Sequence, residues 1–293
     1  MATNYNHIAY SKSSDGEEGF TTLYPNLNFE QHTEMLVDTS DKIVWGSKGG
    51  ATATITHESV SIPDLPSVKD GVHVTQISKG QSGWRGPAGS GGKSFPVVSG
   101  EEYTHSVFLK NNGNTDVTIN LQLGTSNSET NPNSNVKYVN EKAIVPANSD
   151  WKLYSAVITI PEGNSWAWSY VYTDTPTVTA DWSFAGLKVE VGEVQTPWMP
   201  HESEVTSKDY PTYIGTYTDE NENSSTNPAD YTWEMMNYRI YLDGIAVAGS
   251  KLLSAKVENL KPDTSYTIQV KQVSGEEESD FSDSVTFKTN VQK

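Results

Sequence analysis

Apolar and polar residues alternate with a period of two through the middle of the chain. In the stretch 117–123, Val, Ile and Leu occupy the odd positions, whereas Thr118, Asn120 and Gln122 occupy the even ones. Such alternation is typical of a strand that buries one face. Further stretches of this kind, separated by clusters of Gly, Asn, Pro and Ser, lie at 52–56, 72–77, 103–110, 151–160, 166–172 and 182–191. About eight such strands predict an all-β jelly roll or two-sheet sandwich over residues 26–200.

The sequence on either side of this central module predicts smaller parts. Residues 1–25 hold two short apolar pieces around a Ser/Asp/Gly turn, too little for a core, so we expect an extended arm that packs on a neighbouring module or another protein. Residues 201–236 are again polar and predict a connector. Residues 237–293 predict a small C-terminal β-sandwich, because 238–242 alternates into the turn Asp243-Gly244 and 255–270 gives two strands across a Pro-Asp turn. A strand at 285–289 would close this unit.

Charge and cysteine content narrow the range of partners. The chain carries 37 acidic and 20 basic residues, a net charge of −17, which repels phosphate backbones and anionic lipid heads. We therefore expect no nucleic acid and no membrane partner. No window approaches eighteen apolar residues, and the first residues lack the pattern of a signal peptide. The sequence has no Cys, which excludes disulfides, thiol nucleophiles and Cys-ligated zinc.

One predicted strand carries a large aromatic residue at every second position. Trp166, Trp168, Tyr170 and Tyr172 all have even numbers and so line one face of an extended strand. Flat aromatic rings stack on the C–H faces of pyranose sugars, while amides and charged groups bind the hydroxyls. The strand therefore predicts a carbohydrate-binding face. The alternative, that some of these rings fill the core, stays open because Trp and Tyr are also ordinary core residues.

A second candidate carbohydrate site lies in the Gly-rich segment 80–92. There Trp84 stands beside Arg85, and the predicted loop suits the rim of a binding site. The alternative is a Trp that plugs one end of the sandwich. We assign Trp151 and Trp198 to packing.

Catalytic and metal chemistry have little support in the sequence. The six His are scattered, with no His-x-x-x-His pair. The acidic turns 15–18 and 219–222 lack the ligand spacing of a calcium loop and are interpreted as solvated turns. There is no Gly-x-Ser-x-Gly elbow and no phosphate loop, and small sandwiches offer no deep pocket for a pair of catalytic carboxylates. We expect no enzymatic activity and no cofactor.

Two modules resemble known families. Residues 99–110, the strand opened by Trp151, and 186–200 resemble carbohydrate-binding jelly rolls found in glycan-degrading enzymes and in tail and neck proteins of phages of Gram-positive bacteria. The last stretch, G-L-K-x-E-x-G-x-x-x-T-P-W-x-P, looks like the closing strand of the phage modules. Residues 259–270 resemble the L-x-P-x-T-x-Y-x-x-x-V stretch of fibronectin type III domains, but only 231–236 stands where that family's first two strands belong. Either the connector supplies those strands or the sandwich is incomplete.

Both flanking segments, 8–22 and 213–233, also resemble segments of phage virion proteins. These resemblances imply a non-enzymatic surface protein of a siphophage that infects Gram-positive bacteria, in its tail, neck or head, made in the host cytoplasm and released by lysis. They imply other virion proteins, host cell-wall polysaccharide and further copies of the chain as partners, and they allow a structural calcium ion with no nameable ligands. Two alternatives stay open: a purely architectural virion protein, and an accessory carbohydrate-binding protein of a bacterium.

Overall fold

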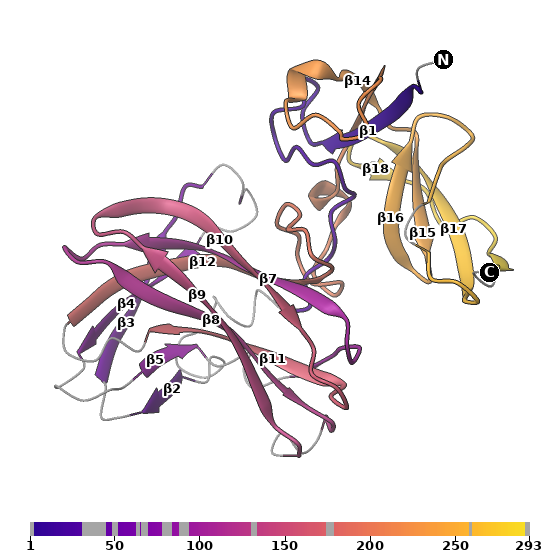
Figure 1. Ribbon diagram of the computed structural model, residues 1–293. Coiled ribbons are helices and arrows are strands. Elements are labelled where there is room, and N and C mark those ends of the chain that lie inside the picture. The colour runs from indigo at the N-terminus through magenta and orange to yellow at the C-terminus, as the bar shows by residue number, and fades with distance from the viewer. Residues whose placement is uncertain are drawn as a thin grey trace. The chain divides into compact units, whose positions relative to one another are not determined.

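The computed structural model describes residues 3–30, 45–48, 52–62, 65, 70–77, 84–87, 94–129, 134–173, 179–257 and 260–290. In this part of the chain all regular elements are strands apart from two short 3₁₀ helices, which confirms the predicted all-β class (Figure 1). The chain divides into two compact units. We call Leu27–Val205 the inserted unit, and Met1–Asn26 together with Thr206–Lys293 the flanking unit.

The inserted unit is a sandwich of two antiparallel sheets (Figure 1). One sheet has the order β10 (Ser149–Thr159), β7 (Glu102–Asn111), β12 (Thr179–Val191), β4 (Asp70–Ile77) and β3 (Thr52–Ser59). The other has the order β2 (Trp45–Lys48), β5 (Trp84–Pro87), β11 (Trp166–Thr173), β8 (Val117–Ser126) and β9 (Lys137–Val145), with β6 (Phe95–Pro96) paired to β11. This arrangement agrees with the jelly-roll or sandwich fold predicted for the central module.

The inward side chains of the two sheets form the core of the inserted unit. On β8 the odd-numbered apolar residues predicted to be buried are at most 3% exposed. They join two clusters of buried apolar side chains, one around Leu109 and Trp182 and one around Tyr103 and Val189. Trp198 belongs to the first cluster and Trp151 packs against it, as predicted for these two residues.

One histidine interrupts this apolar interior. His105 lies on β7 between Tyr103 and Val107 and is fully buried. Neither of its ring nitrogens has a hydrogen-bond partner in the described part of the chain. Burial lowers the pKa of His105 to about 3, so the ring is neutral at physiological pH.

The two ends of the inserted unit are bonded to each other. The backbone N–H of Asn28 donates to the carbonyl of Pro200 at 3.0 Å, and Asn28 forms a parallel bridge with His201. The Asn28 side chain donates to Leu187 O at 2.8 Å and accepts from Val189 N at 2.9 Å. The chain therefore enters and leaves this unit side by side, the arrangement that makes insertion of one domain into another tolerable.

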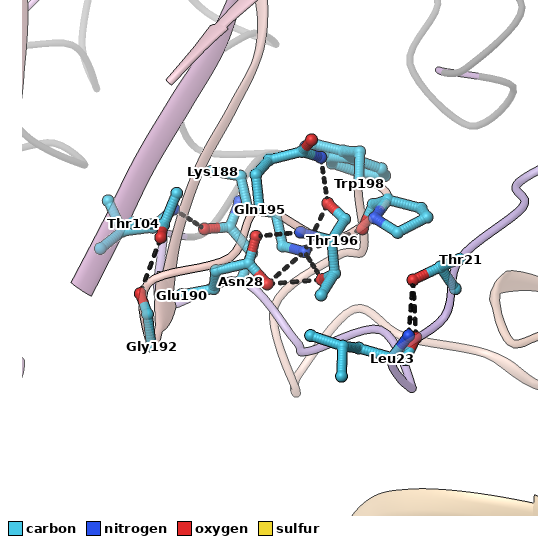
Figure 2. Close-up of polar contacts among 12 residues, drawn as sticks. Thr21, Leu23, Asn28, Thr104, Lys188, Glu190, Gly192, Gln195, Thr196 and Trp198 are labelled. Carbon is cyan, nitrogen blue, oxygen red and sulfur yellow. Dashed lines mark hydrogen bonds and ion pairs between the residues drawn. The ribbon is translucent and has the colours of Figure 1, made fainter. Parts of the chain in front are cut away.

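A buried ion pair fastens the segment that leaves the inserted unit (Figure 2). Lys188 Nζ lies 3.1 Å from Glu190 Oε2 and donates to Thr196 Oγ1 and Pro197 O, both at 2.8 Å. Glu190 accepts from the N–H of Thr196 at 2.9 Å. Burial lowers the pKa of Lys188 to about 8, although the nearby negative charge of Glu190 acts to raise it. Lys188, Glu190 and Thr196, which are the Lys, Glu and Thr of the pattern at 186–200, thus hold the segment around Thr196 against strand β12.

The flanking unit contains two antiparallel sheets. The smaller has the order β1 (Tyr5–Ser11), β13 (Tyr213–Asp219) and β14 (Thr232–Met235). The larger has the order β16 (Ile245–Ser250), β15 (Tyr238–Leu242), β17 (Ser265–Ser274) and β18 (Glu277–Glu278), with β19 (Val285–Lys288) also paired to β17. The 3₁₀ turns η1 (Ser207–Asp209) and η2 (Pro228–Asp230) belong to the same unit. Residues expected as arm and connector therefore form one sheet, and the connector supplies strands β13 and β14.

A buried arginine joins three distant segments of the flanking unit. Arg239 is 1% exposed, and its guanidinium lies over the Tyr210 ring, 4.2 Å from the centroid. It forms an ion pair with Glu278 at 2.7 Å. The Tyr24 ring stacks on Tyr210 with centroids 6.4 Å apart. Cation–π contact and ion pairing offset the cost of burying this charge.

Candidate functional site

The even-numbered side chains of three neighbouring strands share the face that points away from the sandwich core. We call this face of β8, β9 and β11 the outer face. The strand register places its side chains in rows across the sheet. Three of these rows are Tyr138, Gly124 and Trp168; Asn140, Gln122 and Tyr170; and Lys142, Asn120 and Tyr172. Side chains in one row are close enough to act together on a single ligand.

An aromatic cluster occupies one end of the outer face. Tyr138 is 58% exposed, and its ring stands at 90° to that of Trp168 with centroids 6.5 Å apart. Tyr170 completes the cluster, 6.2 Å from Tyr138 and 6.5 Å from Trp168. The Trp168 ring lies directly over Gly124, where a Cβ would come within 2.4 Å of Trp168 Cε2. Glycine at this position makes room for the indole to reach across β8 toward β9.

Side-chain amides occupy the middle of the outer face. Asn140 Nδ2 donates to Asn120 Oδ1 at 2.9 Å, and Gln122 Nε2 donates to the Tyr172 hydroxyl at 3.2 Å. Asn120 is only 1% exposed, and its Nδ2 donates to the Tyr172 carbonyl at 3.4 Å, so this amide orders its neighbours, whereas Asn140 and Gln122 are half-buried. Burial raises the pKa of the Tyr170 hydroxyl, so this group stays protonated and can donate a hydrogen bond. Amides and phenols beside aromatic rings are groups that suit sugar hydroxyls.

The structure brings the four predicted aromatic residues together on β11. Trp166, Tyr170 and Tyr172 are half-buried, whereas Trp168 is only 8% exposed. The intervening Ala167, Ser169 and Val171 are fully buried and point inward. None of the four aromatics belongs to the two clusters of the sandwich interior. Trp168 is thus buried on the outer face beneath its neighbours and serves as a floor rather than as an open stacking surface.

Sequence reasoning missed the part of the outer face that β9 contributes. Tyr138, Asn140 and Lys142 come from this edge strand, which was not predicted. Asn120 and Gln122 were already assigned to the polar side of their strand, so the link to β11 required only the pairing of β8 with its neighbours.

Trp84 and Arg85 do not lie in a loop. Their backbone forms strand β5, which pairs with β2 and places Arg85 opposite Thr173 of β11. The predicted loop is therefore wrong at 84–87, because pairing on both sides extends this Gly-rich segment into a strand. The side chains of Trp84 and Arg85 lie outside the described part of the structure.

Within the described ranges, no three His, Asp or Glu side chains gather in a way that could hold a metal ion. Nor does any helix there have the length and apolarity needed to cross a membrane. The candidate site on the outer face is made of aromatic, amide and lysine side chains.

Comparison with known proteins points to phage baseplates. A family model described as "Minor structural protein 5-like, C-terminal domain" (BppU-like) matches residues 211–269. Among solved structures, a chain of the tripod (BppUct-A-L) from the baseplate of bacteriophage Tuc2009 is 31% identical over 100% of both chains, with a TM-score of 0.65. No curated protein matches the chain.

Weaker similarities cover only part of the chain. The enzymatically active domain of tailspike protein 4 from bacteriophage CBA120 is 9% identical, over 61% of this chain and 23% of that one, with a TM-score of 0.41. The CBM22-1 xylan-binding domain of Paenibacillus barcinonensis Xyn10C is 16% identical, over 58% and 94%, with a TM-score of 0.35. Scores this low do not bear on function.

Proposed function

Since the chain belongs to the family of phage baseplate structural proteins represented by the Tuc2009 tripod, and is thus a component of the virion, we propose that it binds host cell-surface carbohydrate through the outer face of its inserted unit. The flanking unit, which contains the segment 211–269 matched by the baseplate family model, attaches it to other virion proteins.

The observation that carries the proposal is the combination of side chains on the outer face. An exposed Tyr138 ring, a half-buried Tyr170 and the half-buried amides of Asn140 and Gln122 form a polar and aromatic surface on a sheet. Sugars offer apolar C–H faces and a dense set of hydroxyls, which match rings and amides respectively. The inward side chains of β8 and β11 are packed in the core, so the strands that carry this surface are held in place before a ligand binds. Such preorganisation lowers the entropic cost of binding.

Binding by a single copy is expected to be weak. An open sheet face buries only part of each sugar, and one Tyr ring and a few hydrogen bonds typically give modest affinity. Several copies on one particle would raise the overall affinity by orders of magnitude, since after the first contact the others become intramolecular.

The test compares particles that carry altered copies of the chain. Tyr138→Ala combined with Tyr170→Ala is expected to leave the particle assembled and to reduce its adsorption to sensitive cells at least tenfold. Phe281→Ala, which removes a ring that is 44% exposed in the flanking unit, is the matched control. Unchanged adsorption of intact particles with the double variant would favour a purely architectural protein.

A further inference from the structure

The outer face of β8, β9 and β11 carries a single charged side chain, Lys142 on β9. The other members of its row, Asn120 and Tyr172, are neutral. Lys142 is exposed, and in the described part of the chain it makes no ion pair. Its neighbour Glu141 has the opposite phase along the strand and points to the other face. The ammonium group is therefore available to a ligand on the outer face.

A free cation in this position is informative because of the charge of the rest of the chain. The net charge of −17 disfavours the approach of an anionic polymer, although salt limits this repulsion to about 8–10 Å. A lysine within the row places a positive charge where the ligand lies. A neutral glycan would gain little from such a charge, and a glycan rich in amines would be repelled by it.

We propose that the outer face takes a polysaccharide with an anionic substituent, a carboxylate or a phosphodiester, and that the Lys142 ammonium contacts this substituent. The inference rests on the proposed carbohydrate-binding function and specifies the class of polymer. Tyr138 and Tyr170 supply contacts to the sugar rings, the half-buried amides of Asn140 and Gln122 face the hydroxyls, and Lys142 selects for the acidic group two rows away from Tyr138.

The experiment uses the full chain and cell-wall polysaccharide purified from a strain that the particle infects. Binding is measured by affinity electrophoresis for wild type, Lys142→Gln, Lys142→Glu and Lys142→Arg at two salt concentrations. Exposed ion pairs contribute little each, so Lys142→Gln is expected to weaken binding about two- to fivefold and Lys142→Glu by more. Lys142→Arg should keep the affinity, and added salt should weaken wild type more than Lys142→Gln. Lys152→Gln, on β10 of the opposite sheet, is the matched control.

The outcomes separate this inference from the function on which it rests. Binding by wild type that is insensitive to Lys142→Gln and to salt, or binding to a polymer without acidic groups, would overturn the role of Lys142 and leave carbohydrate binding intact. A wild-type chain that binds no wall polysaccharide from a sensitive strain would overturn the proposed function, and this inference with it. Equal losses in Lys142→Gln and Lys152→Gln would mean that general charge, and not the outer face, governs binding.

Discussion

The indole of Trp168 lies so close over Gly124 that a Cβ on the glycine would come within 2.4 Å of the ring atom Cε2. Gly124→Ala should therefore displace the ring and with it the neighbouring Tyr138 and Tyr170. We expect a loss of carbohydrate affinity of at least fivefold and a loss of unfolding free energy of about 1–3 kcal/mol from overpacking. In a Trp168→Ala background the same glycine change should cost much less. Equal effects in both backgrounds, measured by urea unfolding, would show that the two residues are not coupled.

The ion pair of Lys188 and Glu190 is expected to be required for the stability of the inserted unit. Both side chains are at most 1% exposed, so Lys188→Met leaves a buried carboxylate without its cation. Removing one partner of a buried pair typically costs about 3–5 kcal/mol. Urea unfolding should show this loss, with partial recovery when Glu190→Leu is added. Lys208→Met, at an exposed pair with Glu276, should leave the unfolding midpoint nearly unchanged.

Acid should destabilise the inserted unit partly through His105. Its folded pKa, about 3, lies below the unfolded value of about 6.5, so the unfolded chain binds the extra proton first as pH falls. The contribution of the neutral ring is therefore complete above pH 6.5 and is lost as pH falls toward 3, by up to about 4 kcal/mol. Replacement by Leu should flatten the pH dependence of stability in this window relative to wild type. If the two proteins lose stability in parallel, His105 is not the group responsible.

The arrangement of the chain ends predicts that the flanking unit folds without the inserted one. Because Asn28 pairs with Pro200 and His201, a short Gly/Ser linker in place of 29–199 should join the remaining segments without strain. A cooperative thermal transition of the shortened chain, measured by circular dichroism, is the expected result. An unfolded or aggregated product would show that the two parts depend on each other for folding.

Local patterns predicted strands, whereas contacts between distant segments set the site. The alternation at 117–123 correctly gave β8 and its buried side, since period two is a property of one strand. Strand β9 was not predicted because Glu141, at a position that faces inward at the sandwich margin, breaks the alternation of apolar and polar residues. The burial of Lys188 and Glu190 was not predictable either, because it depends on Thr196 folding back onto β12.

The same distinction applies to the aromatic strand. The even numbers of its four aromatic residues, Trp166 to Tyr172, predicted that they share one face of the strand, and the structure shows that face. The exposure of each ring depends on neighbours from other strands, so the burial of Trp168 against Gly124 and the exposure of Tyr138 emerged only from the sheet register.

The most direct test of the central claim measures carbohydrate affinity and stability on the same variant. Tyr138→Ala removes an exposed ring from an edge strand, so its melting temperature should stay within about 2 °C of wild type. Its affinity for wall polysaccharide from a sensitive strain, measured by affinity electrophoresis, should fall at least fivefold. Wild-type affinity in a stable Tyr138→Ala protein would contradict the assignment of the outer face as the carbohydrate site.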